Sequence, residues 1–353
     1  MSMQLGIYGA GHLGRLIASE TDPSTVFIDD TSVLIGQQID QKPVISLETF
    51  ASRYSDIPHL VYLCICLPQY CVYELIQRAS SRVKGKLKIV PFTDYFINHP
   101  DTKAMPHLLW DRSVFSDEYR RQLHKIRSTF SDNESLTALE YFFEVQIKGL
   151  TRPSYISPRD EFHFLESTIN SRTHYIDGGA FDGDTIEKFL SLAKESFRKI
   201  TAVEPDAENV KKLETVISAL PAAIRQKIQI LPAAIASFSG RAQFQANGNT
   251  ASCLSSTGQT CVNTVGLKDL IDEENLLIKL DIEGSEESSI KSALPAIRKY
   301  LPVLAISVYH HSQDMIRIFE ILHNQIPGYQ FAFRILGKNA TDAMLYCFPR
   351  IHS

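Results

Sequence analysis

The sequence THYIDGGAFDGDT, residues 173–185, sets the expected architecture of the C-terminal half of the chain. A short apolar run ends in a glycine-rich turn, and Ile186, Phe189, Leu190 and Ala193 then follow at the spacing of one helix face. This order predicts a strand, a tight turn and a helix that packs one face on a sheet. The glycines let the backbone turn sharply and let a ligand approach it closely.

The same turn carries three acids, Asp177, Asp182 and Asp184. A pyrophosphate would meet like charge there, which costs roughly 1 to 4 kcal/mol for each close pair in wet surroundings. A ligand with a cationic centre and a ribose is favoured instead, and S-adenosylmethionine is the common cofactor of that description. The alternative is an ordinary strand-to-helix turn whose glycines serve geometry only.

Two further strands are expected to end in acids. KITAVEPD, residues 199–206, predicts a strand that ends at Glu204, and LLIKLDIEGSE, residues 276–286, predicts one that ends at Asp281 and Glu283. In a doubly wound sheet, an acid at the end of the second strand lies beside the first glycine turn and can accept hydrogen bonds from both ribose hydroxyls. Three acidic strand ends together indicate a binding site.

These motifs resemble the FkbM-type S-adenosylmethionine-dependent methyltransferases, over roughly residues 160 to 350. The resemblance implies a seven-stranded class I methyltransferase fold and, in most members, O-methylation of a sugar or glycan hydroxyl in polysaccharide biosynthesis. The matching pieces, in the order and spacing of the family, are IDGGAFDGDT (176–185), VEP (203–205), LPAAIASFSG (231–240), VGLKDLI (265–271), IKLDIEGSE (278–286) and SVYHHSQD (307–314).

The N-terminus carries a second strand–glycine–helix unit, MQLGIYGAGHLG at residues 3–14. Its GxGxxG pattern is followed by an acid at the spacing of the dinucleotide fingerprint, and the loop contains no acid that would repel a phosphate. The half-size Rossmann unit resembles the nucleotide-sugar-binding domain of bacterial sugar acyltransferases. A structural or docking domain and a dinucleotide site remain alternatives. The candidate nucleotide-binding residues are Gly9, Gly11, His12, Leu13, Gly14 and Asp29.

The chain is therefore predicted to be an α/β protein with two Rossmann-like domains. Residues 1–98 form the smaller, nucleotide-binding domain, residues 99–158 a helical connector, and residues 159–353 the methyltransferase domain. Residues 239–265 lack a helical pattern and predict an inserted hairpin near the site. Residues 329–335 and 343–348 predict a closing hairpin.

Composition narrows the class of protein. With 44% hydrophobic residues the chain can form two cores, and a formal charge of −4 provides no electrostatic case for a nucleic-acid or membrane partner. The absence of a membrane-length apolar run or a signal pattern predicts a cytoplasmic protein. The six cysteines lack metal-ligand spacing, so we expect reduced thiols and no structural zinc. A homodimer is left open.

The ligand site of an open α/β sheet lies outside the carboxyl ends of its strands. Small residues in this set, Ala233 and Ala234, would leave room for an adenine ring. The residues expected to hold S-adenosylmethionine are Asp177, Gly178, Gly179, Ala180, Phe181, Asp182, Gly183, Asp184, Thr185, Glu204, Pro205, Ala233, Ala234 and Asp281.

The expected catalytic residues are His310, His311, Asp281 and Glu283. Methyl transfer is an in-line displacement, so alignment supplies about 7 to 11 kcal/mol and removal of the acceptor proton about 10²- to 10⁴-fold in rate. A histidine titrates near neutrality and can act as the base, with His310 favoured. As alternate residues of an extended segment, Asp281 and Glu283 are expected to point to opposite sides, and Lys279 is assigned a structural role.

A metal ion is the rival use for Asp281, Glu283 and His310. No metal is predicted, because the sequence contains candidates without coordination geometry. The leading hypothesis is an S-adenosylmethionine-dependent O-methyltransferase whose acceptor is a sugar, glycan or nucleotide-sugar, with a second nucleotide as a candidate ligand of the N-terminal domain. The alternatives are a nucleotide-sugar-binding protein with a weakly active methyltransferase domain, and an NAD-dependent oxidoreductase that uses the N-terminal GxGxxG.

Overall fold

The structure is a computed structural model, which describes residues 4–55, 59–67, 69–83, 87–99, 101–102, 112–158, 162, 165–245, 253–254, 258 and 260–350. The chain divides into two compact units. The first unit comprises Met1–Leu123, Thr137–Ile156 and Gly337–Thr341, and the second comprises His124–Leu136, Ser157–Leu336 and Asp342–Ser353.

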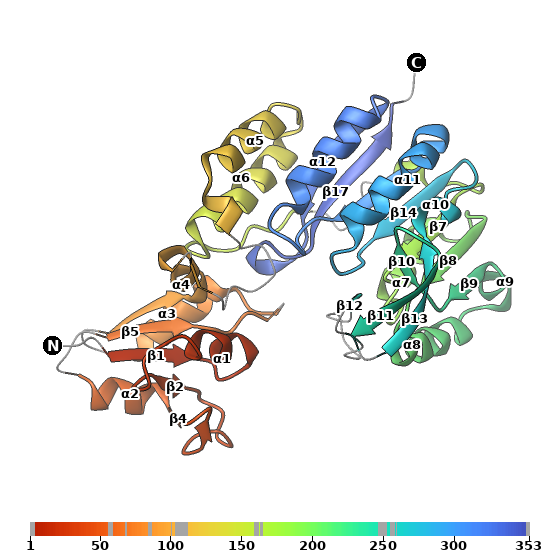
Figure 1. The fold of residues 1–353 in the computed structure, drawn as a ribbon. Coiled ribbons are helices and arrows are strands. Elements are labelled where there is room, and N and C mark those ends of the chain that lie inside the picture. The colour runs from red at the N-terminus through yellow and green to blue at the C-terminus, as the bar shows by residue number, and fades with distance from the viewer. Residues whose placement is uncertain are drawn as a thin grey trace. The chain divides into compact units, whose positions relative to one another are not determined.

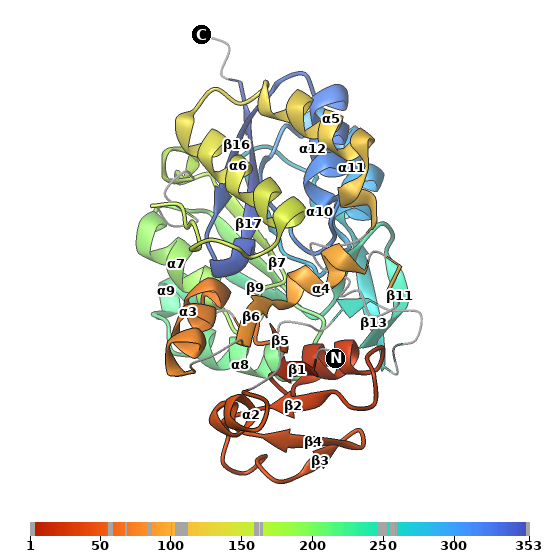
Figure 2. The ribbon, with the colours of Figure 1, turned by 90° about the vertical axis from the view of Figure 1, so that its left-hand side faces the viewer.

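The first unit is built on a six-stranded sheet. Strand β3 lies at one edge of this sheet, next to β4 (Figure 2). The order is β3 (Gln38–Ile39), β4 (Lys42–Ile45), β2 (Val26–Ile28), β1 (Gln4–Tyr8), β5 (His59–Leu63) and β6 (Leu87–Pro91). The strands pair in parallel except for β3, which is antiparallel to β4. The helices are α1 (His12–Ala18), α2 (Leu47–Arg53), α3 (Val72–Arg82) and α4 (Phe92–Asn98). This confirms the smaller Rossmann-like domain.

Two longer helices lie within the predicted connector, α5 (Asp117–Arg127) and α6 (Asn133–Lys148), after a short 3-10 turn at Arg112–Phe115. Each helix contributes residues to both units, since the unit boundaries fall at Leu123 and Leu136. The domain boundaries at residues 98 and 158 stay predictions.

The second unit contains a seven-stranded sheet, as the sequence predicted (Figure 1). Its order is β16 (Tyr329–Ile335), β17 (Ala343–Pro349), β15 (Val303–Ser307), β14 (Leu276–Leu280), β7 (His174–Gly178), β8 (Lys199–Val203) and β9 (Ile228–Leu231). The strands are parallel except for β17, which is antiparallel to both of its neighbours. The pair β16–β17 confirms the closing hairpin.

Helices cover this sheet, and α11 and α12 pack side by side (Figure 1). They are α7 (Asp184–Ala193), α8 (Ala207–Ser218), α9 (Ala222–Arg225), α10 (Leu267–Leu270), α11 (Glu286–Tyr300) and α12 (Asp314–Gln325), with 3-10 turns at Glu166–Thr168 and Lys338–Ala340. The core includes Tyr175 of β7 stacked on Phe189 of α7, with ring centroids 4.5 Å apart. The helical spacing after residue 185 therefore marks the buried face of α7.

The β-rich segment forms more than a hairpin. It joins β10 (Ala234–Ala236) in a four-stranded sheet of order β10, β13 (Thr260–Gly266), β11 (Gly240–Gln245) and β12 (Cys253–Leu254). Strand β11 is antiparallel to both β12 and β13, while β10 and β13 are parallel.

The four central strands of the large sheet determine where the site lies. Strands β8, β7, β14 and β15 are parallel neighbours, so their carboxyl ends meet at one edge. Asp177, Glu204, Asp281 and His310 lie in or directly after these ends. Within the described residues, no helix combines the length and apolar character needed to cross a membrane.

Candidate functional site

The glycine turn after β7 packs directly against the ends of β8 and β14. The backbone N–H groups of Gly179 and Ala180 donate to the carbonyl of Val203, at 3.0 and 3.1 Å. Gly179 has φ +77°, and a Cβ there would lie 1.9 Å from the carbonyl oxygen of Asp281. Only glycine satisfies both conditions, so this position fixes the turn against β14.

Glu204 lies beside the turn, as predicted. One carboxylate oxygen accepts the N–H of Phe181 at 3.0 Å, and the other accepts the N–H of Asp206 at 2.9 Å. The side chain is almost fully buried, and burial raises the pKa of Glu204 although those N–H groups lower it. The oxygen that accepts from Asp206 also accepts a long hydrogen bond from the Asn209 amide at 3.5 Å, so the other oxygen is the more available acceptor for a ribose hydroxyl.

Asp177 is fully buried, and its carboxylate contacts residues of two neighbouring elements. Its Oδ2 accepts the Thr185 hydroxyl at 2.5 Å, and its Oδ1 lies 3.7 Å from Nζ of Lys279. Burial raises the pKa of Asp177, and the Lys279 ammonium opposes that shift. The carboxylate thus links β7, β14 and α7.

Lys279 pairs with two acids that the sequence analysis did not connect with it. It is 5% exposed, and its Nζ lies 3.7 Å from Asp177 and 3.6 Å from Asp281. A cation within the otherwise apolar strand LLIKL was the available indication, because a lysine is almost never buried unless it is paired. It holds together the acids of two strand ends.

The other predicted cofactor residues differ in exposure. Asp184 is exposed and pairs with Lys188 at 3.1 Å, so its charge is directed to solvent. Ala233 and Ala234 are buried at the start of β10. That they line a site for the adenine ring stays a prediction. The half-buried positions are Gly179, Phe181, Asp182 and Pro205, and the buried ones are Gly178, Ala180, Gly183 and Thr185. Their contacts with a cofactor stay predictions.

His310 is the centre of an acidic cluster. Its Nε2 lies 3.4 Å from Oδ1 of Asp281 and 3.5 Å from Oε2 of Glu283, and its Nδ1 lies 3.1 Å from Oε1 of Glu286. The expectation that Asp281 and Glu283 point to opposite sides was wrong. Strand β14 ends at Leu280, and Glu283 has φ +52°, so the chain turns and brings both carboxylates to one imidazole.

The charge state of His310 affects whether its imidazole can act as the catalytic base, which is the role that the sequence analysis assigned to it. Burial alone lowers the pKa of His310, but Glu286, Glu283 and Asp281 outweigh it and raise the pKa well above its usual range. The carboxylates that lie beside His310 are therefore further candidates for the proton acceptor of this cluster.

His311 is placed differently from its neighbour. Its side chain is 54% exposed, and its backbone N–H donates to Asp314 at 2.7 Å at the start of α12. Asp314 also raises the pKa of His311. The hydrogen bond of His311 is thus made at the start of α12.

The N-terminal glycines of the first unit have the three roles of the dinucleotide fingerprint. Gly9 has φ +108° and makes the turn, and a Cβ on Gly14 would lie 1.9 Å from the Gly9 carbonyl. A Cβ on Gly11 would meet no atom within 4 Å, so this position is open to a ligand. His12 and Leu13 begin α1 beside it.

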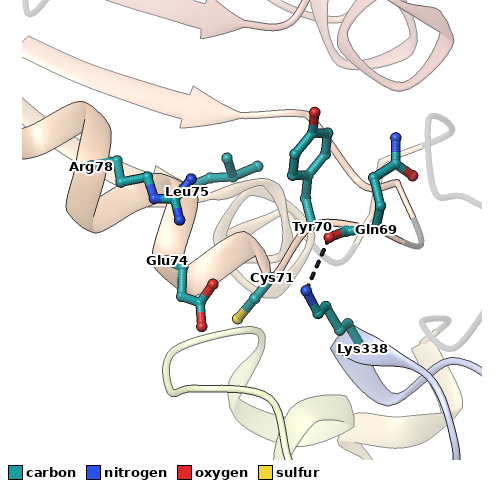
Figure 3. Close-up of a pocket in the computed structure, with 7 residues that line it drawn as sticks. All are labelled: Gln69, Tyr70, Cys71, Glu74, Leu75, Arg78 and Lys338. Carbon is teal, nitrogen blue, oxygen red and sulfur yellow. Dashed lines mark hydrogen bonds between the residues drawn. The ribbon is translucent and has the colours of Figure 1, made fainter.

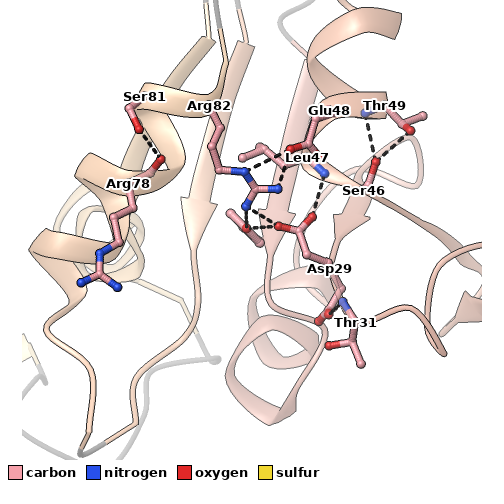
Figure 4. Close-up of polar contacts among 11 residues, drawn as sticks. Asp29, Thr31, Ser46, Leu47, Glu48, Thr49, Arg78, Ser81 and Arg82 are labelled. Atoms are coloured by element: carbon pink, nitrogen blue, oxygen red, sulfur yellow. Dashed lines mark hydrogen bonds and ion pairs between the residues drawn. The ribbon is translucent and has the colours of Figure 1, made fainter.

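Asp29 lies beside this turn as Glu204 lies beside the other one. Its carboxylate accepts the N–H of Ala10 at 3.2 Å and that of Thr31 at 2.9 Å. The adjacent acid, Asp30, is instead paired with Arg82 at 2.6 Å. Arg82 also pairs with Glu48 at 2.5 Å (Figure 4). Of the two acids, Asp29 is therefore the one held against the glycine turn.

The first unit also contains a pocket of about 190 Å³ at the start of α3. Nζ of Lys338 donates to the carbonyl of Gln69 across it (Figure 3). Its lining is Gln69, Tyr70, Cys71, Glu74, Leu75, Arg78 and Lys338, and none of these was a predicted site residue. Cys64, Cys66, Cys71, Cys261 and Cys347 are free thiols among the described residues.

Comparison with known proteins identifies the fold. The crystal structure of methyltransferase FkbM from Methylobacillus flagellatus KT matches with a TM-score of 0.70 and 18% identity, over 98% of this chain and 90% of that one. An rRNA methylase from Streptococcus thermophilus and a putative methyltransferase from Streptococcus mutans in complex with SAH match with TM-scores of 0.35. Their identities are 12% and 11%, over 55% of this chain and 99% of theirs.

The FkbM match confirms the fold that the sequence resemblance implied, and the two weaker matches are too distant to bear on function. The sequence matches no known protein-family profile, and no curated protein matches it. The protein therefore has the fold of the FkbM methyltransferase structure.

Proposed function

We propose that the protein is an S-adenosylmethionine-dependent O-methyltransferase that methylates a hydroxyl of a sugar or glycan. The supporting observation is that one edge of the sheet brings together a glycine turn, the Glu204 carboxylate beside it and the acidic cluster of His310. The fold is also similar to that of the FkbM structure, with a TM-score of 0.70.

The donor set fits a nucleoside cofactor with a cationic centre. Glu204 offers a buried carboxylate at the turn, whose more available oxygen suits a hydroxyl of the ribose. Asp182 is half-buried in the same turn, so the local charge opposes a phosphate and favours a sulfonium. S-adenosylmethionine supplies a methyl group on such a sulfonium.

The residues of the chain then have two tasks in an in-line displacement. The turn and Glu204 hold the methyl donor, and an acceptor hydroxyl must be aligned opposite its methyl group. The O–CH₃ bond forms as the S–CH₃ bond breaks, and the electron pair of the broken bond returns to sulfur. The hydroxyl proton passes to a carboxylate of the acidic cluster, for which Asp281 and Glu283 are the candidates.

The acceptor class rests on the resemblance to FkbM-type enzymes. It is tested by incubating the full-length protein with methyl-labelled cofactor and a panel of nucleotide-sugars and oligosaccharides. Label should enter a sugar product at a hydroxyl. Transfer confined to non-sugar hydroxyls would contradict the acceptor class and leave the methyltransferase proposal intact.

Cofactor binding is tested by calorimetry with wild type, Glu204→Ala and Gly11→Ala. Glu204→Ala should lose about 1 to 3 kcal/mol of S-adenosylmethionine affinity, because the contact to the ribose disappears. Gly11→Ala, in the other unit, is the matched control and should bind normally. Absence of binding by wild type would overturn the proposed function.

We also propose that the first unit binds a nucleotide or nucleotide-sugar at Gly9–Gly14 and Asp29. The supporting observation is that a Cβ on Gly11 would meet no atom within 4 Å, whereas a Cβ on Gly14 would lie 1.9 Å from the Gly9 carbonyl oxygen. A methyl group at Gly11 therefore obstructs a ligand without disturbing the protein. Gly11→Ala should keep the wild-type melting temperature and lose affinity for the bound nucleotide-sugar or NADH, and unchanged affinity for every nucleotide tested would contradict this proposal.

A further inference from the structure

The acidic cluster of His310 has the geometry of a metal site. One donor atom each from Asp281, Glu283 and His310 lies within 4.8 Å of the other two. Two ligands at right angles, each about 2.1 Å from an ion, lie about 3.0 Å apart. The observed separations from Nε2, 3.4 and 3.5 Å, therefore need to shorten by only about 0.5 Å.

A second observation points to a ligand at the same place. His310 is 5% exposed, and its Nε2 has no hydrogen-bond partner among the described residues although it faces two carboxylates. Oδ1 of Asp281 is likewise buried without a hydrogen bond. A buried polar atom without a hydrogen bond is unfavourable, and a cation between these two atoms would remove that cost.

His174 provides an internal comparison within the same unit. It is buried to a similar extent, at 6% exposed, but both of its ring nitrogens are bonded, to Glu273 and to Thr201, each at 2.8 Å. A buried histidine of this unit can therefore have both ring nitrogens bonded. His310 does not, although three carboxylates surround it.

The other ring nitrogen of His310 also lies close to a carboxylate. Metal-bound histidines donate their other ring N–H to a carboxylate, which fixes the ring. Nδ1 of His310 lies 3.1 Å from Oε1 of Glu286, and that carboxylate oxygen is itself held by the N–H of Ile282 at 2.8 Å. A small rotation of the ring completes this donation and leaves Nε2 directed at Asp281 and Glu283.

We propose that Asp281, Glu283 and His310 bind a divalent cation of the magnesium or manganese class. Two carboxylate oxygens and one imidazole make an oxygen-rich set with no thiolate, which suits Mg²⁺ and Mn²⁺. Three protein ligands leave coordination positions for water or a substrate oxygen.

The role of the cation rests on the proposed function. Bound beside the methyl donor, it would hold the acceptor oxygen in place and make its hydroxyl more acidic, so that the proton leaves more readily. With the cation bound, Asp281 and Glu283 act as ligands and no longer as proton acceptors, so the hydroxyl proton passes to solvent water. Glu286 acts as a positioning residue for His310.

The test is the binding of Mn²⁺ to chelator-treated, full-length protein, measured by the loss of the free Mn²⁺ EPR signal. Wild type should bind one Mn²⁺ per chain, and Mg²⁺ should compete. Glu283→Gln and His310→Ala should each weaken binding at least tenfold, and Glu286→Gln about 10- to 100-fold. Glu273→Gln, which makes the same charge change at the His174 pair, is the matched control and should bind as wild type does.

Two results would overturn the cation site. One is that wild type binds no Mn²⁺ at millimolar concentration, and the other is that folded Glu283→Gln binds Mn²⁺ with wild-type affinity. If His310→Ala does not fold, Glu283→Gln still decides the question. Calorimetry of S-adenosylmethionine with the same metal-free protein separates the two proposals. Cofactor binding without Mn²⁺ binding refutes the cation alone, and Mn²⁺ binding without cofactor binding supports the cation site while refuting the methyltransferase.

Discussion

Lys279→Met removes the ammonium group that faces the buried carboxylate of Asp177. Methionine keeps most of the volume of the lysine stem, so the loss is mainly one of charge. Asp177 is fully buried, whereas the Asp281 side chain is 29% exposed. Water can therefore compensate Asp281 but not Asp177, and the uncompensated Asp177 carboxylate should dominate the effect.

The magnitude follows from the 3.7 Å separation of Lys279 and Asp177. At an effective dielectric constant of about 20, that pair is worth about 4.5 kcal/mol, and removal of one partner from a buried pair costs about 3 to 5 kcal/mol. For a unit of this size such a loss lowers the melting temperature by roughly 6 to 20 °C.

Differential scanning calorimetry of wild type, Lys279→Met and the double variant Lys279→Met/Asp177→Asn tests this reasoning. Asparagine removes the charge and can still accept the Thr185 hydroxyl, so the double variant should recover much of the lost stability. A single variant as stable as wild type, or a double variant no more stable than the single one, would refute it.

The pH dependence has a definite sign. Burial raises the pKa of Asp177, and loss of Lys279 raises it further. Above that pKa the folded state holds a buried charge, and as the pH falls the folded state takes up a proton before the unfolded state does. The stability difference between Lys279→Met and wild type should therefore be largest at pH 7.5 and narrow toward pH 5.

Three further substitutions test the two glycine turns. Gly179→Ala should destabilise the second unit by several kcal/mol, because its new methyl group would lie 1.9 Å from the Asp281 carbonyl at φ +77°; a normal melting temperature would contradict this account of the turn. Gly14→Ala should destabilise the first unit, because its methyl group would lie 1.9 Å from a turn carbonyl, and Gly11→Ala is the control in the same thermal scan. Thr185→Val should cost about 1.5 to 3 kcal/mol in urea unfolding, because it removes a hydrogen bond to a buried carboxylate; a loss below 0.5 kcal/mol would show that the bond contributes little.

Much of the fold was predictable from local patterns. The sequence from 173 to 185 predicted β7, its turn and α7, and residues 329–335 and 343–348 predicted the pair β16–β17. The position of Glu204 beside the turn was also predictable, because the carboxyl end of the second strand in a doubly wound sheet always lies next to the first turn. These features depend on chain order and on residues close in sequence.

The composition of the acidic cluster depended on tertiary structure. The backbone turn at Glu283 reverses the side that strand alternation assigned to it, and periodicity contains no information about one residue with positive φ. Lys279 acquires its role because β14 lies between β7 and β15, which places Asp177 and Asp281 within reach of one ammonium group. Glu286 reaches His310 from the start of another helix. Such distances arise from packing between segments far apart in the chain, so residue spacing could name the candidates but not their partners.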